Sequence, residues 1–105
     1  VRAAEPVGEV RRRLSMSQPE VLSLMQRLRD ELEGYVATSD APEDVRHSSL
    51  QRLHSGCVML GLHRAAVLLK RAGDATATRR DQLVAEAARF SRQWLSTIQA
   101  SQTGG

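Results

Sequence analysis

The apolar residues of the chain recur at three- and four-residue intervals, which is the spacing of amphipathic helices and not of strands. The clearest stripe begins after the motif S-Q-P-E at residues 17–20, which has the form of a capping box with proline in the first turn. Its members are Val21, Leu24, Leu28, Leu32 and Tyr35. The pattern predicts a helix from about residue 19 to about residue 38.

A second apolar stripe follows Pro42, and the acidic pair E-D at residues 43–44 suits the first turn of a helix. The stripe consists of Leu50, Leu53, Cys57 and Leu60. Gly61 interrupts the pattern. Residues 62–72 therefore form either a short separate helix or a continuation of the second helix after a kink, and Gly73 closes this segment.

The C-terminal part of the sequence predicts one more long helix. The motif T-R-R-D at residues 78–81 resembles a capping box, and the helix should end near residue 101. Its apolar face is formed by Val84, Ala87, Ala88, Trp94, Leu95 and Ile98. Near the N-terminus, Val7, Val10 and Leu14 predict a short amphipathic helix over residues 9–14.

Four main helices with short connections predict an all-α fold, an up-down-up-down four-helix bundle with a short extra N-terminal helix. The 105 residues, 41% of them hydrophobic, suit a single domain with the bundle over residues 19–100. Because the chain starts with Val1 and ends in Gly104-Gly105, we expect it to be a piece excised from a longer protein. No apolar run approaches the roughly 20 residues of a membrane span, so we expect no membrane contact by this domain.

Charge is distributed unevenly along the chain. The net charge of +3 is too small to favour a nucleic-acid binder. Between residues 45 and 73 there is no acidic residue, and this segment contains the basic residues Arg46, Arg52, Arg64, Lys70 and Arg71. The middle of the chain should therefore present a positive surface to an acidic partner. Three histidines, at 47, 54 and 63, lack the spacing of a metal site, and we expect no metal or cofactor.

Polar residues of the second helix form a stripe of their own. At 100° per residue, the stripe lies beside the apolar one and contains His47, Gln51, His54, Ser55 and Val58, with Arg52 at its border. Cys57 belongs to the apolar stripe, which predicts a buried thiol and not a nucleophile. A glycine in mid-helix, here Gly56, costs ~1 kcal/mol relative to alanine and indicates a packing requirement.

The segment around this stripe, L-Q-R-L-H-S-G-C-V-M-L-G-L at residues 50–62, resembles the core helix of histidine-containing phosphotransfer (HPt) domains. Their signature is roughly H-x-L-K-G-x-x-x-x-x-G, and a sub-group at the C-termini of hybrid sensor kinases has H-x-L-H-G-x-C-x-x-x-G-[VL]. Aligned without gaps, this chain matches at Leu53, His54, Cys57, Gly61 and Leu62. The resemblance implies a cytoplasmic module of bacterial two-component signalling, at the C-terminus of a membrane-anchored sensor kinase.

The ungapped alignment places Gln51 where the family has its phospho-accepting histidine. A glutamine amide is not nucleophilic enough to form a phosphoramidate, so this register implies a domain that cannot relay phosphate. A second register takes His54 as the acceptor, with three residues lost before Gly61. That deletion would lie inside a helix and turn the following residues by about 60°. We favour the ungapped register, and with it a protein-docking domain over an enzyme.

Both registers imply docking of a response-regulator receiver domain, which presents an acidic pocket. Small residues at Ser55 and Gly56 would let the receiver approach, while Arg52 and His54 would meet its phosphate or carboxylate oxygens. Arg46 and Arg64 would add longer-range attraction. Three hypotheses follow: a degenerate HPt domain that only docks, an active HPt domain using His54, and an unrelated helical binding module.

Overall fold

The computed structural model describes residues 3–38 and 40–103 of the chain, with side chains described as far as residue 100. Within these residues it contains five helices and no strand, so the predicted all-α class is confirmed. In chain order they are α1 (Val7–Leu14), α2 (Gln18–Ala37), α3 (Glu43–Met59), α4 (His63–Gly73) and α5 (Ala77–Thr103). Residues 62–72 form a separate helix and the turn before it, and they do not continue the second helix after a kink.

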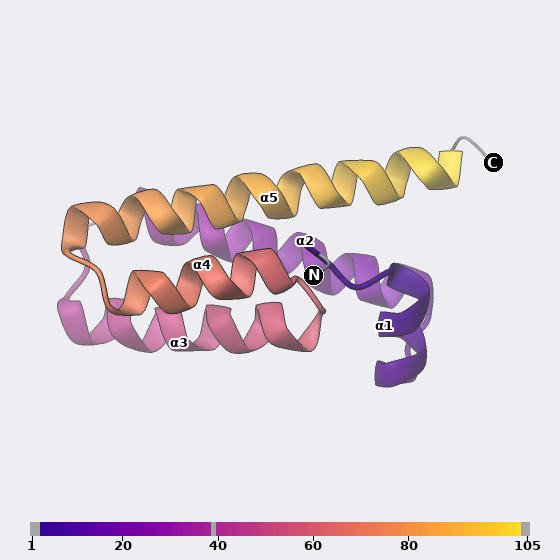
Figure 1. Cartoon of the computed structure of the whole chain (residues 1–105), viewed down its shortest axis with the longest axis horizontal. Coiled ribbons are helices and arrows are strands. Elements are labelled where there is room, and N and C mark those ends of the chain that lie inside the picture. Colours follow the sequence, from indigo (N-terminus) through magenta and orange to yellow (C-terminus); the bar gives the residue numbers. More distant parts are fainter. Residues whose placement is uncertain (1–2, 39, 104–105) are drawn as a thin grey trace.

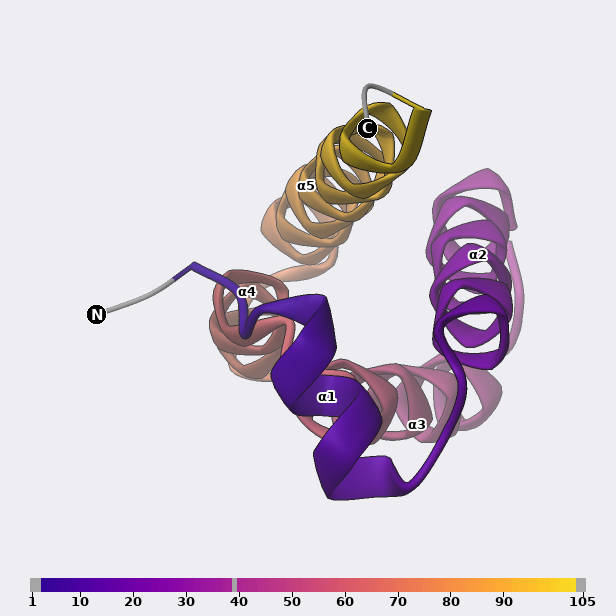
Figure 2. The same cartoon turned by 90° about the vertical axis from the view of Figure 1, so that its right-hand side faces the viewer.

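The four longer helices pack as a ring in which α2 contacts α3, α3 contacts α4, α4 contacts α5, and α5 contacts α2 (Figures 1 and 2). Short connections join them in chain order. Helix α1 stands at a steep angle to the others at one end of the molecule and packs against α2 (Figure 1). The molecule is elongated, with extents of 43 × 25 × 24 Å. The arrangement is that of a helical bundle with one additional short helix.

The core runs along the centre of this ring. Each of the four longer helices buries at least one large aliphatic residue to 2% exposure or less: Leu32, Leu53, Leu69 and Leu95. Burying one such side chain contributes about 2 kcal/mol, so these apolar stripes supply much of the stability. Two of the three aromatic residues, Phe90 and Trp94, are only partly buried against this core. Aliphatic packing therefore dominates.

Helix α2 begins at the predicted capping box. The Ser17 N–H donates to Glu20 Oε1 at 3.1 Å, and the Glu20 N–H donates to Ser17 Oγ at 3.3 Å. The hydrogen bond from the Ser17 backbone N–H favours the ionised carboxylate and lowers the pKa of Glu20. The capping box predicted at 78–81 is wrong, because α5 begins at Ala77 and includes Thr78. Asp81 instead forms an ion pair with Arg46 of α3.

The turn between α3 and α4 is a Schellman motif centred on Gly61. The Leu62 N–H donates to the Cys57 carbonyl at 2.9 Å and the Gly61 N–H to the Val58 carbonyl at 3.1 Å. Gly61 has φ +72°, a left-handed conformation that strains any residue with a Cβ. Three residues separate the last residue of α3, Met59, from the first residue of α4, His63, which explains why the apolar pattern is interrupted here.

An N-terminal strap, residues 3–6, is fastened across this turn. The Glu5 N–H donates to the Gly61 carbonyl at 2.8 Å, and the Arg64 N–H donates to the Ala3 carbonyl at 2.9 Å. Arg13 of α1 reaches both the Glu5 carboxylate, at 2.6 Å, and the Met59 carbonyl, at 2.7 Å. The strap therefore caps part of the α4 N-terminus and holds α1 against the end of α3.

We predict that Gly61→Ala destabilises the protein by about 2 kcal/mol, because the left-handed backbone is strained and the new Cβ would lie 2.5 Å from the Glu5 Cβ. The free energy of unfolding from urea titration measures the effect. The matched control is Gly34→Ala in α2, whose Cβ would meet nothing within 4 Å. It should stabilise the protein by about 0.5 kcal/mol. Equal effects of the two substitutions would contradict the role assigned to Gly61.

Candidate functional site

Four residues singled out in the sequence line one groove between α3 and α4. They are His47, Gln51, His54 and Ser55, and the groove has a volume of about 560 Å³. His54 is half-buried, and the other three are exposed. The buried leucines Leu50 and Leu69 also line the groove. The structure thus brings together the residue at the expected acceptor position and the histidine three residues after it.

Gln51 is held by a neighbour one turn earlier on the same helix. Its Nε2 lies 3.2 Å from Nε2 of His47. Because an amide NH₂ group only donates, the imidazole nitrogen of His47 is the acceptor in this contact. The bond orients the amide and leaves a second amide hydrogen unused. Gln51 can therefore donate a hydrogen bond to a ligand in the groove, but it supplies no nucleophile.

Two charged residues also line the groove: Lys70 of α4 and Asp74, which caps the C-terminal end of α4. Both are exposed, and neither has an ion-pair partner among the residues that the structure describes. Sequence reasoning assigned them no place in the site. The signal was available, because two helices folded back around Gly61 bring residues at similar distances from the turn face to face, as Gln51 and Lys70 are.

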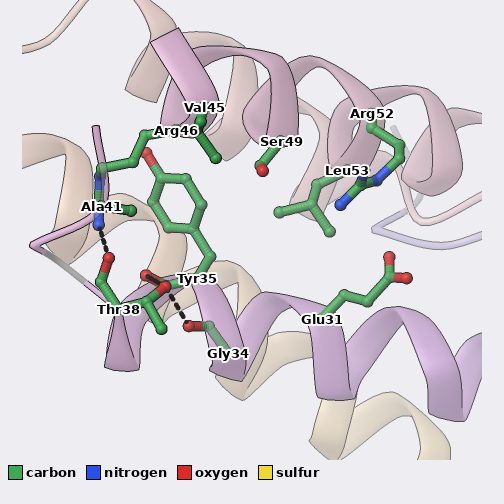
Figure 3. A pocket seen from close by; sticks show the side chains of 10 residues that line it. All are labelled: Glu31, Gly34, Tyr35, Thr38, Ala41, Val45, Arg46, Ser49, Arg52 and Leu53. Carbon is green, nitrogen blue, oxygen red and sulfur yellow. Dashed lines mark hydrogen bonds between the residues drawn. The ribbon is translucent and has the colours of Figure 1, made fainter. Parts of the chain in front are cut away.

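Arg52 does not border this groove. It lies on the other side of α3, in a smaller pocket of about 210 Å³ between α2 and α3. Figure 3 shows Arg52 on α3 and Glu31 on α2 at opposite walls of that pocket. The expectation that Arg52 would act beside His54 is corrected. Two residues along a helix correspond to 200°, which places the two side chains on opposite faces.

Gly56 also faces α2 and not the groove with the histidines. A Cβ at this position would lie 3.2 Å from the Leu28 Cδ1 of α2. The missing side chain therefore lets α2 and α3 pack closely, which is a structural reason for a mid-helix glycine. Gly56 was predicted as a docking residue, but it faces α2 and does not line the groove. Ser55 remains as the small residue at the groove.

Two more of the expected docking residues are exposed. Val58 is 53% exposed, one turn beyond His54 on α3. Arg64 is exposed near the start of α4, where its backbone N–H is bound by the N-terminal strap. The side chains of Val58 and Arg64 are therefore accessible to a partner.

Arg46 is the second correction among the predicted docking residues. It is buried, with 6% of its surface exposed, and its guanidinium lies 4.2 Å from the centre of the Tyr35 ring. Arg46 donates to the Thr38 carbonyl at 2.7 Å (Figure 3). It also forms an ion pair with Asp81 of α5. Its charge is compensated inside the bundle, where it joins the ends of α2, α3 and α5, and it does not contribute to a docking surface.

We predict that Asp81→Asn destabilises the protein by about 2 kcal/mol, since it leaves the buried Arg46 charge without its counter-ion. The control is Glu43→Gln. It breaks the ion pair with Arg80, in which the Glu43 side chain is 69% exposed, and should cost less than about 1 kcal/mol. Thermal unfolding of both variants at low salt checks the difference. A larger loss of stability for Glu43→Gln than for Asp81→Asn would contradict the role assigned to the buried Arg46–Asp81 ion pair.

Cys57 is fully buried in the core, as expected from its place on the apolar stripe. Burial raises the pKa of its thiol to about 12. At a pH near 8 the thiolate fraction is then roughly one in ten thousand, and the thiolate is the reactive form. The thiol therefore carries no nucleophilic chemistry in the folded domain.

We predict that the aromatic disulfide reagent DTNB labels Cys57 of the folded protein at least about a hundredfold more slowly than in urea-unfolded protein at the same pH. Labelling followed by absorbance at about pH 8 measures both rates. Asp81→Asn, which loosens the fold without touching the thiol, should accelerate labelling. Fast labelling of the folded wild-type protein would place the thiol at the surface and contradict its burial.

The described residues contain no group of three or more His, Cys, Asp or Glu side chains that could hold a metal ion. Over the same part of the chain, no helix is long and apolar enough to span a bilayer. No family model matches the sequence, no curated protein is significantly similar to it, and no solved structure matches it.

Proposed function

We propose that the chain is a degenerate HPt-like domain that docks a receiver domain and does not carry phosphate. The observation that carries the proposal is Gln51, an exposed amide in the α3–α4 groove at the position where the family signature has its acceptor histidine. His54 and Ser55 stand beside it in the same groove. The proposed docking surface consists of His47, Gln51, His54, Ser55 and Val58, with Arg64 near its end.

The turn at Gly61 belongs to both registers, so the choice between them rests on the residues before it. Gly61 matches the last glycine of the signature, and it occupies the left-handed position that ends α3. The register with His54 as acceptor places the acceptor seven residues before Gly61 in place of the ten of the signature, whereas Gln51 keeps the full spacing. A half-buried imidazole is also less accessible to a receiver's phosphoaspartate than the exposed side chain at position 51.

The proposal extends to the setting of the domain. We take its topology as up-down-up-down, residues 1–105 as a single domain, and its place as the cytoplasmic C-terminus of a bacterial hybrid sensor kinase. A module without an acceptor would act as a binding platform for the receiver. The unrelated helical binding module remains the alternative if no receiver binds.

We predict that wild-type protein stays unlabelled when incubated with receiver domains phosphorylated by acetyl phosphate, and that Gln51→His gains a label. The introduced imidazole would attack the phosphorus of the receiver's aspartyl phosphate and form a phosphoramidate at the accessible position of α3, while the P–O bond breaks and the aspartate carboxylate leaves. The measurement uses radiolabelled acetyl phosphate and a panel of bacterial receiver domains. The label on Gln51→His should be lost in acid and survive in mild alkali.

Two controls separate chemistry from docking. Ser55→Glu, which places a carboxylate beside position 51, should abolish labelling of the Gln51→His variant and receiver binding together, because it repels an acidic partner. The matched control is Ser23→Glu on α2, which is exposed and outside the groove, and it should change neither. A wild-type label that disappears in His54→Ala would overturn the degenerate assignment in favour of His54.

A further inference from the structure

The α3–α4 groove offers hydrogen-bond donors on both of its walls. On α3 these are the second amide hydrogen of Gln51, the imidazole of His54 and the hydroxyl of Ser55; on α4 it is the ammonium group of Lys70. His54 and Lys70 have no hydrogen-bond partner among the described side chains. A ligand that accepts hydrogen bonds from both walls would therefore use groups that the folded domain leaves free.

The geometry of the acceptor decides which ligand fits such a groove. A carboxylate is planar and presents two oxygens, whereas a phosphoryl group presents three terminal oxygens spread around a tetrahedral centre. A carboxylate can accept from both walls with its two oxygens, but the third oxygen of a phosphoryl group lets it accept from a further donor at the same time. The phosphoryl group also carries close to two negative charges, so its attraction to Lys70 is stronger.

The charged groups facing the groove are Lys70 and Asp74 of α4 and the two titratable histidines of α3, His47 and His54. Asp74 lies one turn after Lys70, at the end of α4. Its carboxylate opposes an anion, which lowers the affinity and confines the favourable position to the part of the groove near Lys70 and Gln51. Leu50 and Leu69 line the same groove and are buried, so part of its lining is apolar and strengthens these charge interactions.

We infer that the groove between α3 and α4 holds the phosphoryl group of the docked receiver without accepting it, with Lys70 and the Gln51 amide as its principal donors. The domain then binds the phosphorylated form of its partner more tightly than the unphosphorylated form. The inference rests on the proposed function and adds that docking is regulated. A site without an acceptor histidine would bind the receiver according to whether the receiver is phosphorylated.

The test uses inorganic phosphate as the probe. Isotope-labelled wild-type protein is titrated with phosphate, and separately with acetate, at about pH 8 and constant ionic strength. We expect saturable NMR shifts of the Gln51 side-chain amide and of α4 amides near Lys70, with phosphate bound at least about fivefold more tightly than acetate. Equal affinity for the two anions, or shifts confined to the arginines of α1, would overturn the inference.

Two substitutions on α4 sharpen the result. Lys70→Gln should weaken phosphate binding by roughly fivefold, whereas Asp74→Asn should strengthen it by roughly twofold to fivefold. Arg71→Gln is the matched control, because it removes the same charge from the next residue, which does not line the groove. An equal loss for Arg71→Gln would show that only overall charge matters and would contradict a defined site.

The outcome is separable from that of the receiver experiments. If receivers dock but phosphate and acetate bind alike, the phosphoryl site is wrong and the docking proposal stands. If phosphate binds selectively but no receiver docks, the groove is a phosphoryl site and the proposed function is wrong. Docked receivers that bind equally with and without beryllofluoride, a phosphoryl mimic, would overturn the inferred preference even where free phosphate binds.

Discussion

The reversal of the chain at Gly61 is the constraint on which the candidate site depends. Its left-handed backbone closes α3 with a Schellman turn and directs α4 back along α3. Without that reversal, Lys70 and Asp74 would not face Gln51, and the groove would have one wall. The N-terminal strap adds to the constraint, since Glu5 binds the Gly61 carbonyl and crowds any side chain at this position. The left-handed backbone of Gly61, which lies outside the groove, thus determines which residues of the α4 segment line it.

A second constraint acts at the opposite end of α3. Arg46 stacks on Tyr35, binds the Thr38 carbonyl and pairs with Asp81, so three helices meet at one buried guanidinium. Burying a charge is unfavourable unless its partners are fixed. The main effect of this contact is therefore to fix how the three helices are arranged, and its net contribution to stability is smaller. Helix α3 is therefore held at both ends, by a turn at one and by an ion pair at the other. Its exposed face between these points is left available for binding.

Local patterns in the sequence predicted most of the helices. The features that they did not predict depend on contacts between residues far apart in the sequence. The capping box at Ser17 and Glu20 is a contact across three residues, so it could be read directly. Arg46 lies four and seven residues before Leu50 and Leu53, which is the spacing of the core stripe, so its burial was visible in the periodicity. Its partner Asp81 was not, because nothing local links residues 35 positions apart. Lys70 enters the site through the packing of α4 on α3, and the one signal for it in the sequence is that Lys70 and Gln51 lie at similar distances from Gly61.

In the proposed function, the domain keeps receiver binding and loses phosphotransfer. This combination is possible because most of the groove does not depend on the residue at position 51. Replacing an imidazole by an amide of similar reach removes the nucleophile and keeps a hydrogen-bond donor, so a partner's anionic group can still be bound there. The other groups of the groove, on α3 and α4, are positioned by the Gly61 turn and the leucine core and are indifferent to that change. Loss of transfer therefore need not carry loss of binding. Under the proposed function, docking leaves the phosphoryl group on the receiver, so binding can depend on whether the receiver is phosphorylated.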